Sequence, residues 1–504
     1  MMKIQKRILS AMLAMLFALS LSGCAKKNPS PNASNGTSEV TLPIGETGVP
    51  QAPLGDKWDS EVYRASIYYA QSEASVSVPS TRVLWLGAQS SVERRHAEEL
   101  MKVPGGDAIS VVPRGSRVAQ VEAAGEIVTV NVLPTAVMTD LETKTLADAM
   151  SRTLFELEGV SGVNLLLHGR AASVYSLPIG LITKNTDLSA LLDEAIHFPE
   201  SGNSAVSRRI AGYYPSLDET CVIPCEILIS HNPDDPAEAV LRALGSVPQS
   251  ARGVISGVPA CETMFQKKSQ YEIMPGGDRV IKVHLTNDAL LALDESGHDR
   301  HMYLASIVLS LTSFLNDTDG VVITIGGKTI TEVPLSGGIK RTFPSGVMKR
   351  DDFTPYIGEN VTLYFAGEND MLIPEIRALP IAEADSARAR ISALMKGPDD
   401  VSLLPIFPGG VKTSDILGIQ ISGNVASVNF SSNVYRLLQS FTQSQEELFV
   451  YGLVNTLSEL RGVSGVRLYF EGVTGSCLTH KVYLEGVLLK NPGRVYEIVS
   501  SASN

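Results

Sequence analysis

The sequence QEELFVYGLVNTLSELRGVSGVRLYFEG, residues 445–472, predicts a helix followed by a glycine stop, a tight turn and a strand. Ser444 and Glu447 have the S-x-x-E spacing of a capping box, which satisfies two backbone donors at a helix start. Apolar residues then recur at the spacing of one helix face, which predicts an amphipathic helix. They are Val450, Leu453, Val454, Leu457 and Leu460.

The residues after this helix carry the signals of a stop and a strand. Gly462 is placed for a left-handed helix stop, because glycine adopts positive φ without steric penalty, and Gly465 suits the turn that follows. Beyond it, side chains alternate as on a strand with one buried face. The expected inward residues are Val466, Leu468 and Phe470, and the expected outward ones are Arg467, Tyr469 and Glu471.

The same pattern occurs twice more in the chain. Residues 153–169, TLFELEGVSGVNLLLHG, repeat it without a gap. The identical pairs are Thr153/Thr456, Leu154/Leu457, Leu157/Leu460, Gly159/Gly462, Val160/Val463, Ser161/Ser464, Gly162/Gly465, Val163/Val466 and Gly169/Gly472. A more divergent copy has Leu315, Gly320, Val321 and Gly327 in the register of Leu460, Gly465, Val466 and Gly472. Since such repeats reflect one structural unit used several times, the sequence predicts three related modules.

Length and composition agree with three globular modules. The chain has 504 residues, and about 150 residues is an ordinary domain size. Hydrophobic residues make up 44% and charged residues 19%, so each module can bury a core. The formal net charge of -12 argues against non-specific nucleic-acid binding and against electrostatic adhesion to anionic lipid. No nucleic-acid partner is therefore expected.

The cysteines indicate neither a disulfide framework nor a metal site. Cys221, Cys225, Cys261 and Cys477 are few for a chain of this length. Cys221 and Cys225 lie in CVIPC, which lacks the C-x-x-C spacing of redox and zinc sites. We expect these residues to be buried or paired structural cysteines.

An export signal is predicted for residues 1–23. Lys3, Lys6 and Arg7 give it a positive start, and the apolar run Ile8–Leu21 is too short for a comfortable membrane span. The tetrapeptide ending in Cys24, Leu-Ser-Gly-Cys, resembles the bacterial lipobox. This resemblance implies that Cys24 bears a lipid, which would hold the protein on the extracytoplasmic face of the cell membrane. A plain secretory signal with an incidental cysteine is the alternative.

The remaining chain divides into a tether and three modules. A flexible tether is expected over residues 24–60, because residues 26 to about 56 are rich in Ser, Asn, Pro, Gly and Thr and should have no secondary structure. The first module covers 61–200, the degenerate middle module 201–352 and the third module 353–504. Short connections favour antiparallel pairing, so we expect an α+β fold in which each mainly antiparallel sheet has two helices on one face.

The expected elements follow the same order in each module. In the first, we expect strands at 66–70, 82–86, 118–121, 127–132, 163–167 and 174–182, and helices at 93–102 and 143–158. In the middle, we expect strands at 226–230 and 280–285 and helices at 237–244 and 303–315. In the third, we expect strands at 361–365, 375–381, 425–430 and 481–489, and a helix capped by Asp385 that Gly397-Pro398 ends. The closing strands align at 177–184, 343–350 and 484–491, where Gly180, Gly346 and Gly486 coincide.

Several of these segments resemble the GerMN domain of sporulation and spore-germination lipoproteins. The resemblance rests on the lipobox, Ile67-Tyr68-Tyr69 and the Leu-Tyr-Phe of the third module, and the segments 394–398, 407–410 and 425–430. It implies envelope lipoproteins of spore-forming bacteria, with domains similar to the ring-building modules of secretion and sporulation complexes. Envelope or sporulation proteins would then be the partners, and an oligomer is compatible with that role.

We find no motif that specifies catalysis. Gly326-Gly327-Lys328-Thr329 resembles the end of a phosphate loop but closes a strand instead of opening a helix. His298 and His301 lie close in sequence without a further Cys or His ligand, so a solvated helix entrance is the simpler interpretation.

The other polar candidates have equally plain interpretations. Asn131, Asn429 and His284 end equivalent strands, where a turn hydrogen bond is expected. The pairs Asp399-Asp400 and Asp234-Asp235 read as solvated turn carboxylates.

These observations favour a non-enzymatic, lipid-anchored assembly protein of the cell envelope, without cofactor, metal or catalytic residues. The alternative is an extracytoplasmic binding module for peptidoglycan or another envelope ligand. An assembly module should present an apolar patch or an open sheet edge. A ligand-binding module should present a concave pocket with convergent polar groups.

Overall fold

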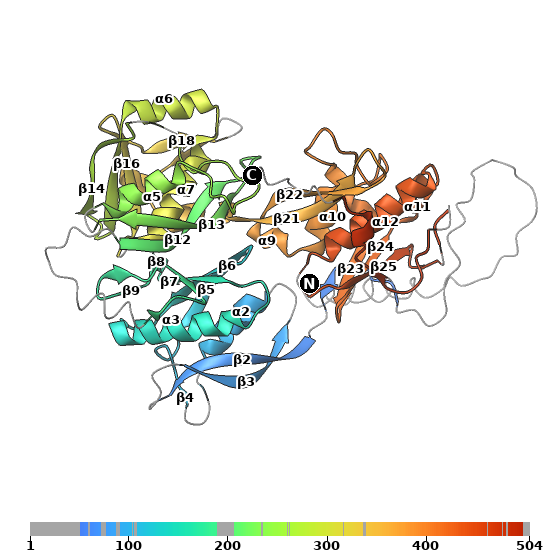
Figure 1. The fold of residues 1–504 in the computed structure, drawn as a ribbon, viewed down its shortest axis with the longest axis horizontal. Helices are drawn as coiled ribbons and strands as arrows, with labels where there is room; N and C mark the ends of the chain where they lie inside the picture. Colours follow the sequence, from blue (N-terminus) through green and yellow to red (C-terminus); the bar gives the residue numbers. More distant parts are fainter. Residues whose placement is uncertain are drawn as a thin grey trace, which may run out of the picture. The chain divides into compact units, whose positions relative to one another are not determined.

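The computed structural model describes residues 51–496 (Figure 1). The gaps in this range are 59–60, 72–76, 87–90, 103, 105–107, 189–205, 233–234, 260, 262, 316, 336–338, 461, 476 and 480–481. The expected signal, Cys24 and most of the tether lie outside the described residues. No helix within the described ranges is both long and apolar enough to cross a membrane.

The first module consists of a hairpin, a mixed sheet and two helices. The hairpin is formed by β2 (Glu61–Gln71) and β3 (Val78–Leu86), and the short β4 (Ala108–Ile109) pairs with β2. The sheet has the order β11-β7-β6-β5, formed by Leu181–Thr183, Gly162–Leu167, Ile127–Leu133 and Arg117–Ala124. Figure 1 shows α2 (Val92–Leu100) and α3 (Asp140–Phe155) between the hairpin and this sheet, and all contribute to one core.

The middle module repeats this plan with longer insertions. Its hairpin is β12 (Val206–Pro215) and β13 (Val222–His231), followed by α5 (Pro236–Leu244). Its sheet joins β14 (Phe265–Ile273), β15 (Arg279–Leu285), β16 (Gly320–Ile325) and β20 (Val347–Met348). Helices α6 (Asn287–Ser296) and α7 (Arg300–Phe314) lie between β15 and β16 in the chain.

The third module follows after the short helix α8 (Arg350–Phe353). Its hairpin is β21 (Gly358–Ala366) and β22 (Leu372–Pro380), followed by α9 (Ile381–Ala384) and α10 (Ala387–Lys396). Its sheet joins β23 (Ile416–Ser422), β24 (Val425–Phe430), β25 (Gly465–Phe470) and β26 (Leu488–Leu489). Helices α11 (Ser432–Leu438) and α12 (Gln443–Leu457) connect β24 to β25.

The central strand pair of each sheet is parallel, whereas the other strand pairs within each module are antiparallel. The expectation of mainly antiparallel sheets is therefore met in part. β6 pairs with β7, β15 with β16 and β24 with β25 in the same parallel register, starting at Ile127↔Gly162, Val280↔Gly320 and Val425↔Gly465. The helix between each pair is long enough to return the chain to the same sheet end, which parallel pairing requires. The fold is therefore a mixed α/β arrangement with several antiparallel sheets.

The expected alternation along β25 holds except at one residue. Val466, Leu468 and Phe470 are buried as expected, but Tyr469 is buried too, with 1% of its surface exposed. Arg467 is partly exposed and Glu471 is exposed, so the expectation is wrong for Tyr469 alone.

Helix starts and glycine roles differ locally from the expected ones. Helix α12 begins at the N-cap Thr442, whose capping box uses Gln445. The overlapping S-x-x-E pattern of Ser444 and Glu447 therefore lies inside the helix. Likewise, Ser386 and not Asp385 caps α10, because its hydroxyl accepts from the Ala389 N–H.

Two glycines of residues 445–472, Gly462 and Gly465, have different roles. Gly462 has φ +77° as expected, although α12 has already ended at Leu457. Gly465 is not in the turn: it is the first residue of β25, and a Cβ there would collide with Val487.

The closing strands are shorter than expected. Of the described residues in the closing segments, those of β11, β20 and β26 pair with the central strands, and the remainder of 174–182 and of 482–489 forms short pairs and turns. Gly180, Gly346 and Gly486 all have positive φ, at 73°, 72° and 71°. This conformation turns the chain just before the short strand and limits its length.

Part of the expected tether is a strand. β1 (Lys57–Trp58) pairs in parallel with β23 of the third module, at Lys57↔Gln420 and Trp58↔Ile421. The expectation of a flexible tether over 24–60 is therefore wrong for these residues. The preceding chain contacts the same module: the Gly55 N–H donates to the Leu417 carbonyl at 2.8 Å.

Candidate functional site

The two histidines considered for a metal have separate structural roles. The His298 ring pairs with the Glu219 carboxylate before α7. His301 is buried beside the Phe353 and Tyr356 rings, and neither of its ring nitrogens has a hydrogen-bond partner among the residues that the structure describes. Among the described residues, no cluster of three His, Cys, Asp or Glu side chains could hold a metal ion.

The polar residues at the strand ends support turns. The Gly169 N–H donates to Asn131 Oδ1 at 2.8 Å, and the Gly472 N–H donates to Asn429 Oδ1 at 3.0 Å. In the middle module, His284 Nδ1 lies 2.7 Å from Thr324 Oγ1. The expected turn hydrogen bonds are therefore present in the first and third modules.

The remaining sequence candidates also lie in turns. Gly326 and Gly327 form the turn between β16 and β17 (Lys328–Thr329), so the segment does not open a helix. The backbone N–H groups of Asp399 and Asp400 donate to Glu375. Asp235 precedes α5, and Asp234 lies outside the described residues.

The four described cysteines are free thiols. Burial raises the pKa of Cys221 to about 11 and that of Cys225 to about 12. Since the thiolate is the reactive form, these two side chains are packing residues and not nucleophiles.

A repeated contact positions the first strand of each module on its long helix. The backbone N–H groups of Tyr68, Tyr213 and Tyr364 donate to the hydroxyls of Thr153, Ser310 and Thr456 at 2.9, 2.9 and 3.1 Å. In the first and third modules, the tyrosine hydroxyl also donates to a glutamate three residues further on, just after the last helical residue, Glu156 or Glu459.

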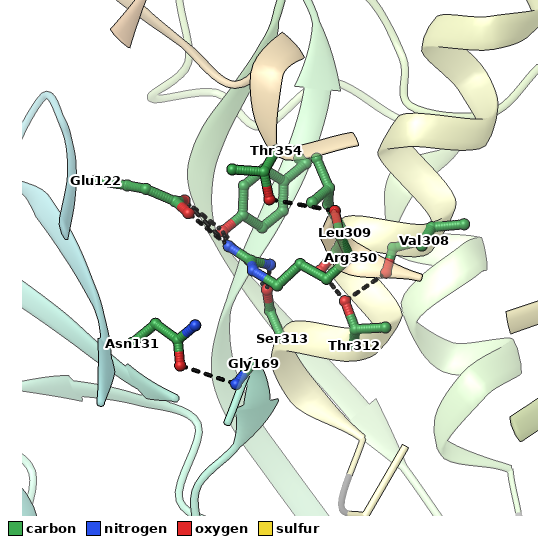
Figure 2. Close-up of polar contacts among 10 residues, drawn as sticks. Glu122, Asn131, Gly169, Val308, Leu309, Thr312, Ser313, Arg350 and Thr354 are labelled. Carbon is green, nitrogen blue, oxygen red and sulfur yellow. Dashed lines mark hydrogen bonds and ion pairs between the residues drawn. The ribbon is translucent and has the colours of Figure 1, made fainter. Parts of the chain in front are cut away.

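The middle module replaces that glutamate by Ser313, and a carboxylate from the first module takes its place. Tyr213 Oη donates to Glu122 Oε2 at 3.2 Å, and Glu122 comes from β5. Arg350 Nη2 lies 2.8 and 3.1 Å from the two Glu122 oxygens, and Arg350 Nη1 donates to Ser313 Oγ at 2.7 Å (Figure 2). The contact that lies inside one module in the other two cases here joins the first module to Arg350 at the start of α8. We call this cluster of Glu122, Tyr213, Ser313 and Arg350 the lock.

This lock is sealed from water. Glu122 is 1% exposed and Arg350 4% exposed. Burial alone would lower the pKa of Arg350, but the Glu122 carboxylate and the Tyr213 hydroxyl raise it above its ordinary value, so the guanidinium stays charged. Burial raises the pKa of Tyr213, so its hydroxyl remains a donor. Both charged side chains are buried and paired with each other, which is the arrangement of a structural ion pair.

Sequence reasoning missed this cluster because its members are far apart in the chain. Glu122 and Arg350 are separated by 228 positions. A signal did exist: the repeat aligns Ser313 with Glu156 and Glu459, so the middle tyrosine lacked its usual carboxylate.

The segment before the first module is held on the third module by polar contacts. Arg388 of α10 pairs with Asp56, and its Nη2 lies 2.6 Å from Asp56 Oδ1. The Ile419 N–H donates to the same oxygen at 3.2 Å, and Asn429 Nδ2 donates to the Pro53 carbonyl at 3.0 Å. Residues 53–58 therefore cover the outer edge of β23.

The first module presents a different sheet edge that no described strand covers. β3 is the outer strand of the order β3-β2-β4. Val83 and Trp85 project from it with 59% and 63% of their surface exposed, whereas Leu84 faces the core. Pro79, which cannot donate to an added strand, lies at the other end of β3. The Val83–Trp85 end is thus an apolar edge open to pairing.

Comparison with family models identifies one family in three places. A model described as "Germane: Sporulation and spore germination" matches residues 66–173, 212–331 and 362–475, which together make up more than half of the chain. Each match lies within one of the three modules.

Individual relatives share low sequence identity with this chain. Spore germination protein GerM of Bacillus subtilis (strain 168) is 23% identical over 275 residues, which cover 47% of this chain and 74% of that protein. The solved tandem GerMN domains of the sporulation protein GerM from the same species are 20% identical, with a TM-score of 0.23, and the match covers 58% of this chain and 99% of that one. A putative lipoprotein from Clostridium perfringens is 11% identical, with a TM-score of 0.18, over 24% and 88% of the two chains.

Proposed function

Because the chain belongs to the Germane family of sporulation and spore germination, we propose that it is a lipid-anchored, non-enzymatic envelope protein that acts in these processes by binding other proteins. The likeness to ring-building modules that the sequence suggests is part of this proposal. The relative GerM supports the role in germination by its name.

The observation that carries the binding role is the open edge of β3. An extended segment of another envelope protein would add to this edge as a further strand, and Val83 and Trp85 would receive its apolar side chains. The same chain already uses this mode, because Lys57–Trp58 adds to β23 as an extra strand. The sequence candidates for chemistry offer no competing site, since they lie in turns, in caps or in the packed interior.

The test replaces both exposed side chains and captures partners from the envelope of sporulating cells. Lysines at Val83 and Trp85 should abolish capture, because charge at an edge strand opposes strand addition. Leu228→Lys is the matched control, since Leu228 is 69% exposed on β13 of another module, away from the proposed edge. Captured proteins would be identified by mass spectrometry. Equal capture by the Val83/Trp85 variant and the wild type would refute this surface, and capture of wall fragments alone would favour the ligand-binding alternative.

The lipid anchor is tested separately. Replacing Cys24 with Ala should release the protein from the membrane fraction or leave the signal uncleaved. Normal processing and full membrane retention of the Cys24→Ala protein would refute a lipid on this residue.

A further inference from the structure

The middle module contains an apolar cavity of about 500 Å³. It lies beneath α6 and is walled by aliphatic side chains from the sheet and from both helices, among them Leu285, Leu290, Leu293, Leu304 and Ile325. Its volume falls in the range of small-molecule sites, which is about 300–1,000 Å³.

The equivalent space in the third module is filled by aromatic rings. Phe407, Phe430, Phe449 and Phe470 contact one another with ring centroids 5.2–6.3 Å apart, and Tyr435 packs on Phe470 at 5.4 Å. Phe430, Phe449 and Phe470 have no exposed surface.

Strand register shows which residues replace these rings on the sheet. Phe430↔Phe470 is the last pair of the parallel ladder in the third module, and Leu285↔Ile325 is the last pair in the middle module. Two phenylalanines are thus exchanged for a leucine and an isoleucine. Ile325 is partly exposed, whereas Phe470 is fully buried.

The helices and the preceding loop show the same exchange. Ser431 and Thr286 are the N-caps of α11 and α6, so Leu290 occupies the helical position of Tyr435. In the loop, Phe407-Pro408 corresponds to Val258-Pro259. The correspondence is supported by the facing pairs Ile406/Gly452 and Gly257/Ser306, in which a glycine faces a larger side chain in each module.

One of these positions keeps an aromatic side chain in the middle module, but that side chain carries a hydroxyl. The hydroxyl–amide contacts of Ser310 and Thr456 put α7 and α12 in register, so Tyr303 occupies the position of Phe449. Tyr303 lines the cavity. Four large rings are therefore lost from the middle module and a fifth carries a hydroxyl, which accounts for the open space.

The mouth of the cavity carries a cation that no carboxylate neutralises. Arg300 is paired with Asp294, and Glu332 is paired with Lys340. Lys328 also lines the cavity, is exposed, and has no ion pair among the described residues. An apolar wall with one cation at its rim is complementary to an apolar chain that ends in an anion.

We propose that the middle module binds a single-chain amphiphile with an anionic head, such as a long-chain carboxylate, with its chain between α6 and the β15–β16 sheet and its head at Lys328. A fatty acid and a lysophospholipid share this chemistry. The binding does not depend on the lipid anchor or on the β3 edge, so failure of either leaves this inference standing.

The experiment is calorimetric titration of the purified full chain with dodecanoate and with uncharged dodecanol. A single saturable site for dodecanoate is expected. The Leu285→Phe/Ile325→Phe protein, which copies the third module, should bind about tenfold or more weakly because the rings fill the cavity. Thermal unfolding should show that this protein is folded. Leu290→Tyr, which copies Tyr435 at the surface of the cavity, is a second variant that leaves the sheet unchanged.

Lys328→Ala distinguishes the head group from the chain. It should weaken dodecanoate binding about threefold and leave dodecanol binding unchanged, since an exposed ion pair contributes modestly. A lysophospholipid with an anionic head should compete with dodecanoate if the site accepts a lipid source, and failure to compete would restrict it to free carboxylates. Absence of saturable binding by the wild type, or unchanged binding by the folded Phe variants, would overturn the proposal and leave the cavity as a packing defect.

Discussion

Arg350 shows how one residue can couple parts of the chain that are distant in sequence. Its guanidinium is 4% exposed and reaches Glu122, Tyr213 and Ser313. Removing two charges from water is unfavourable, so the pair contributes little net stability compared with an apolar pair of the same shape. We expect the pair to favour one arrangement of these segments, because burying either charge without its partner is strongly unfavourable.

Arg350→Met should therefore destabilise the protein strongly. The change leaves the Glu122 carboxylate buried without its cation, which typically costs about 3–5 kcal/mol. Urea unfolding measures this. The double variant Arg350→Met/Glu122→Met should recover much of the loss. Arg209→Met is the control, because Arg209 and Glu226 form an exposed pair whose loss should cost about 1 kcal/mol or less. An Arg350→Met protein as stable as this control would contradict the argument.

His301 makes the stability depend on pH. Burial, with a smaller effect of the Arg341 charge, lowers the pKa of His301 to about 4, although Asp299 and Asp352 oppose the shift. Because the pKa in the folded state is below the ordinary value, the folded state favours neutral imidazole. The contribution of His301 to the free energy of unfolding is fully present above about pH 6.5. It is lost as the pH falls toward 4, which lowers the free energy of unfolding by up to about 3 kcal/mol.

The measurement is the thermal unfolding temperature between pH 7 and pH 4. The wild type should lose stability steeply over this range, and His301→Leu should give a flatter profile because it removes the group that must be protonated. Parallel profiles for the two proteins would show that other groups cause the acid sensitivity.

At the scale of elements, the long helix of each module covers the inner edge of the hairpin. One hydroxyl on that helix satisfies one strand amide, as in the bond from the Tyr364 N–H to Thr456 Oγ1. A strand edge with a covered and satisfied amide cannot accept a foreign strand. The contact recurs with Thr153 and Ser310, so the middle module has kept it although its sequence has diverged.

Thr456→Val should destabilise the third module by about 1–3 kcal/mol, because it leaves a buried N–H without an acceptor at nearly constant volume. Thr456→Ser should restore most of this loss, since serine already serves this purpose at position 310. Chemical unfolding of the full chain distinguishes the two variants. Equal unfolding of the Val and Ser variants would show that the hydroxyl does not matter.

At the scale of the whole molecule, the start of the described chain is attached to its last module. Residues 53–58 lie on β23, and the first hairpin begins at Glu61. The third module therefore receives a strand from outside it. Only two residues separate Trp58, which pairs with β23, from Glu61, where the first hairpin begins. The Cα atoms of Trp58 and Glu61 can therefore be at most about 11 Å apart.

Gly55→Pro should release this segment. Gly55 has φ +82° and donates its N–H to Leu417, and proline permits neither. Amide exchange at Ile419, whose N–H bonds to Asp56, should become about tenfold faster. Exchange at the central strand β25 should not change. Leu54→Ala is the control, because Leu54 is 81% exposed. Unchanged exchange at Ile419 would mean that the segment does not protect β23.

The sequence alone determined the repeat, the position of most strands and helices, and the left-handed glycines. The strands 127–132 and 425–430 and the positive φ of Gly159 and Gly462 follow from alternation and from glycine placement. It also led to the family and to the correct interpretation of Asn131 and Asn429 as turn residues. These features depend on residues that are close together in the chain, so local chemistry specifies them.

Tertiary structure decided what depends on residues far apart in the chain. Four features belong to this class. They are the parallel central strands, the burial of Tyr469, the Glu122–Arg350 lock and the strand at Lys57–Trp58. So does the cavity of the middle module, since no single substitution opens it: rings from two strands, a helix and a loop must be lost together. Pairing partners and packing volumes are set by the whole fold, whereas a sequence pattern records only which side of an element is apolar.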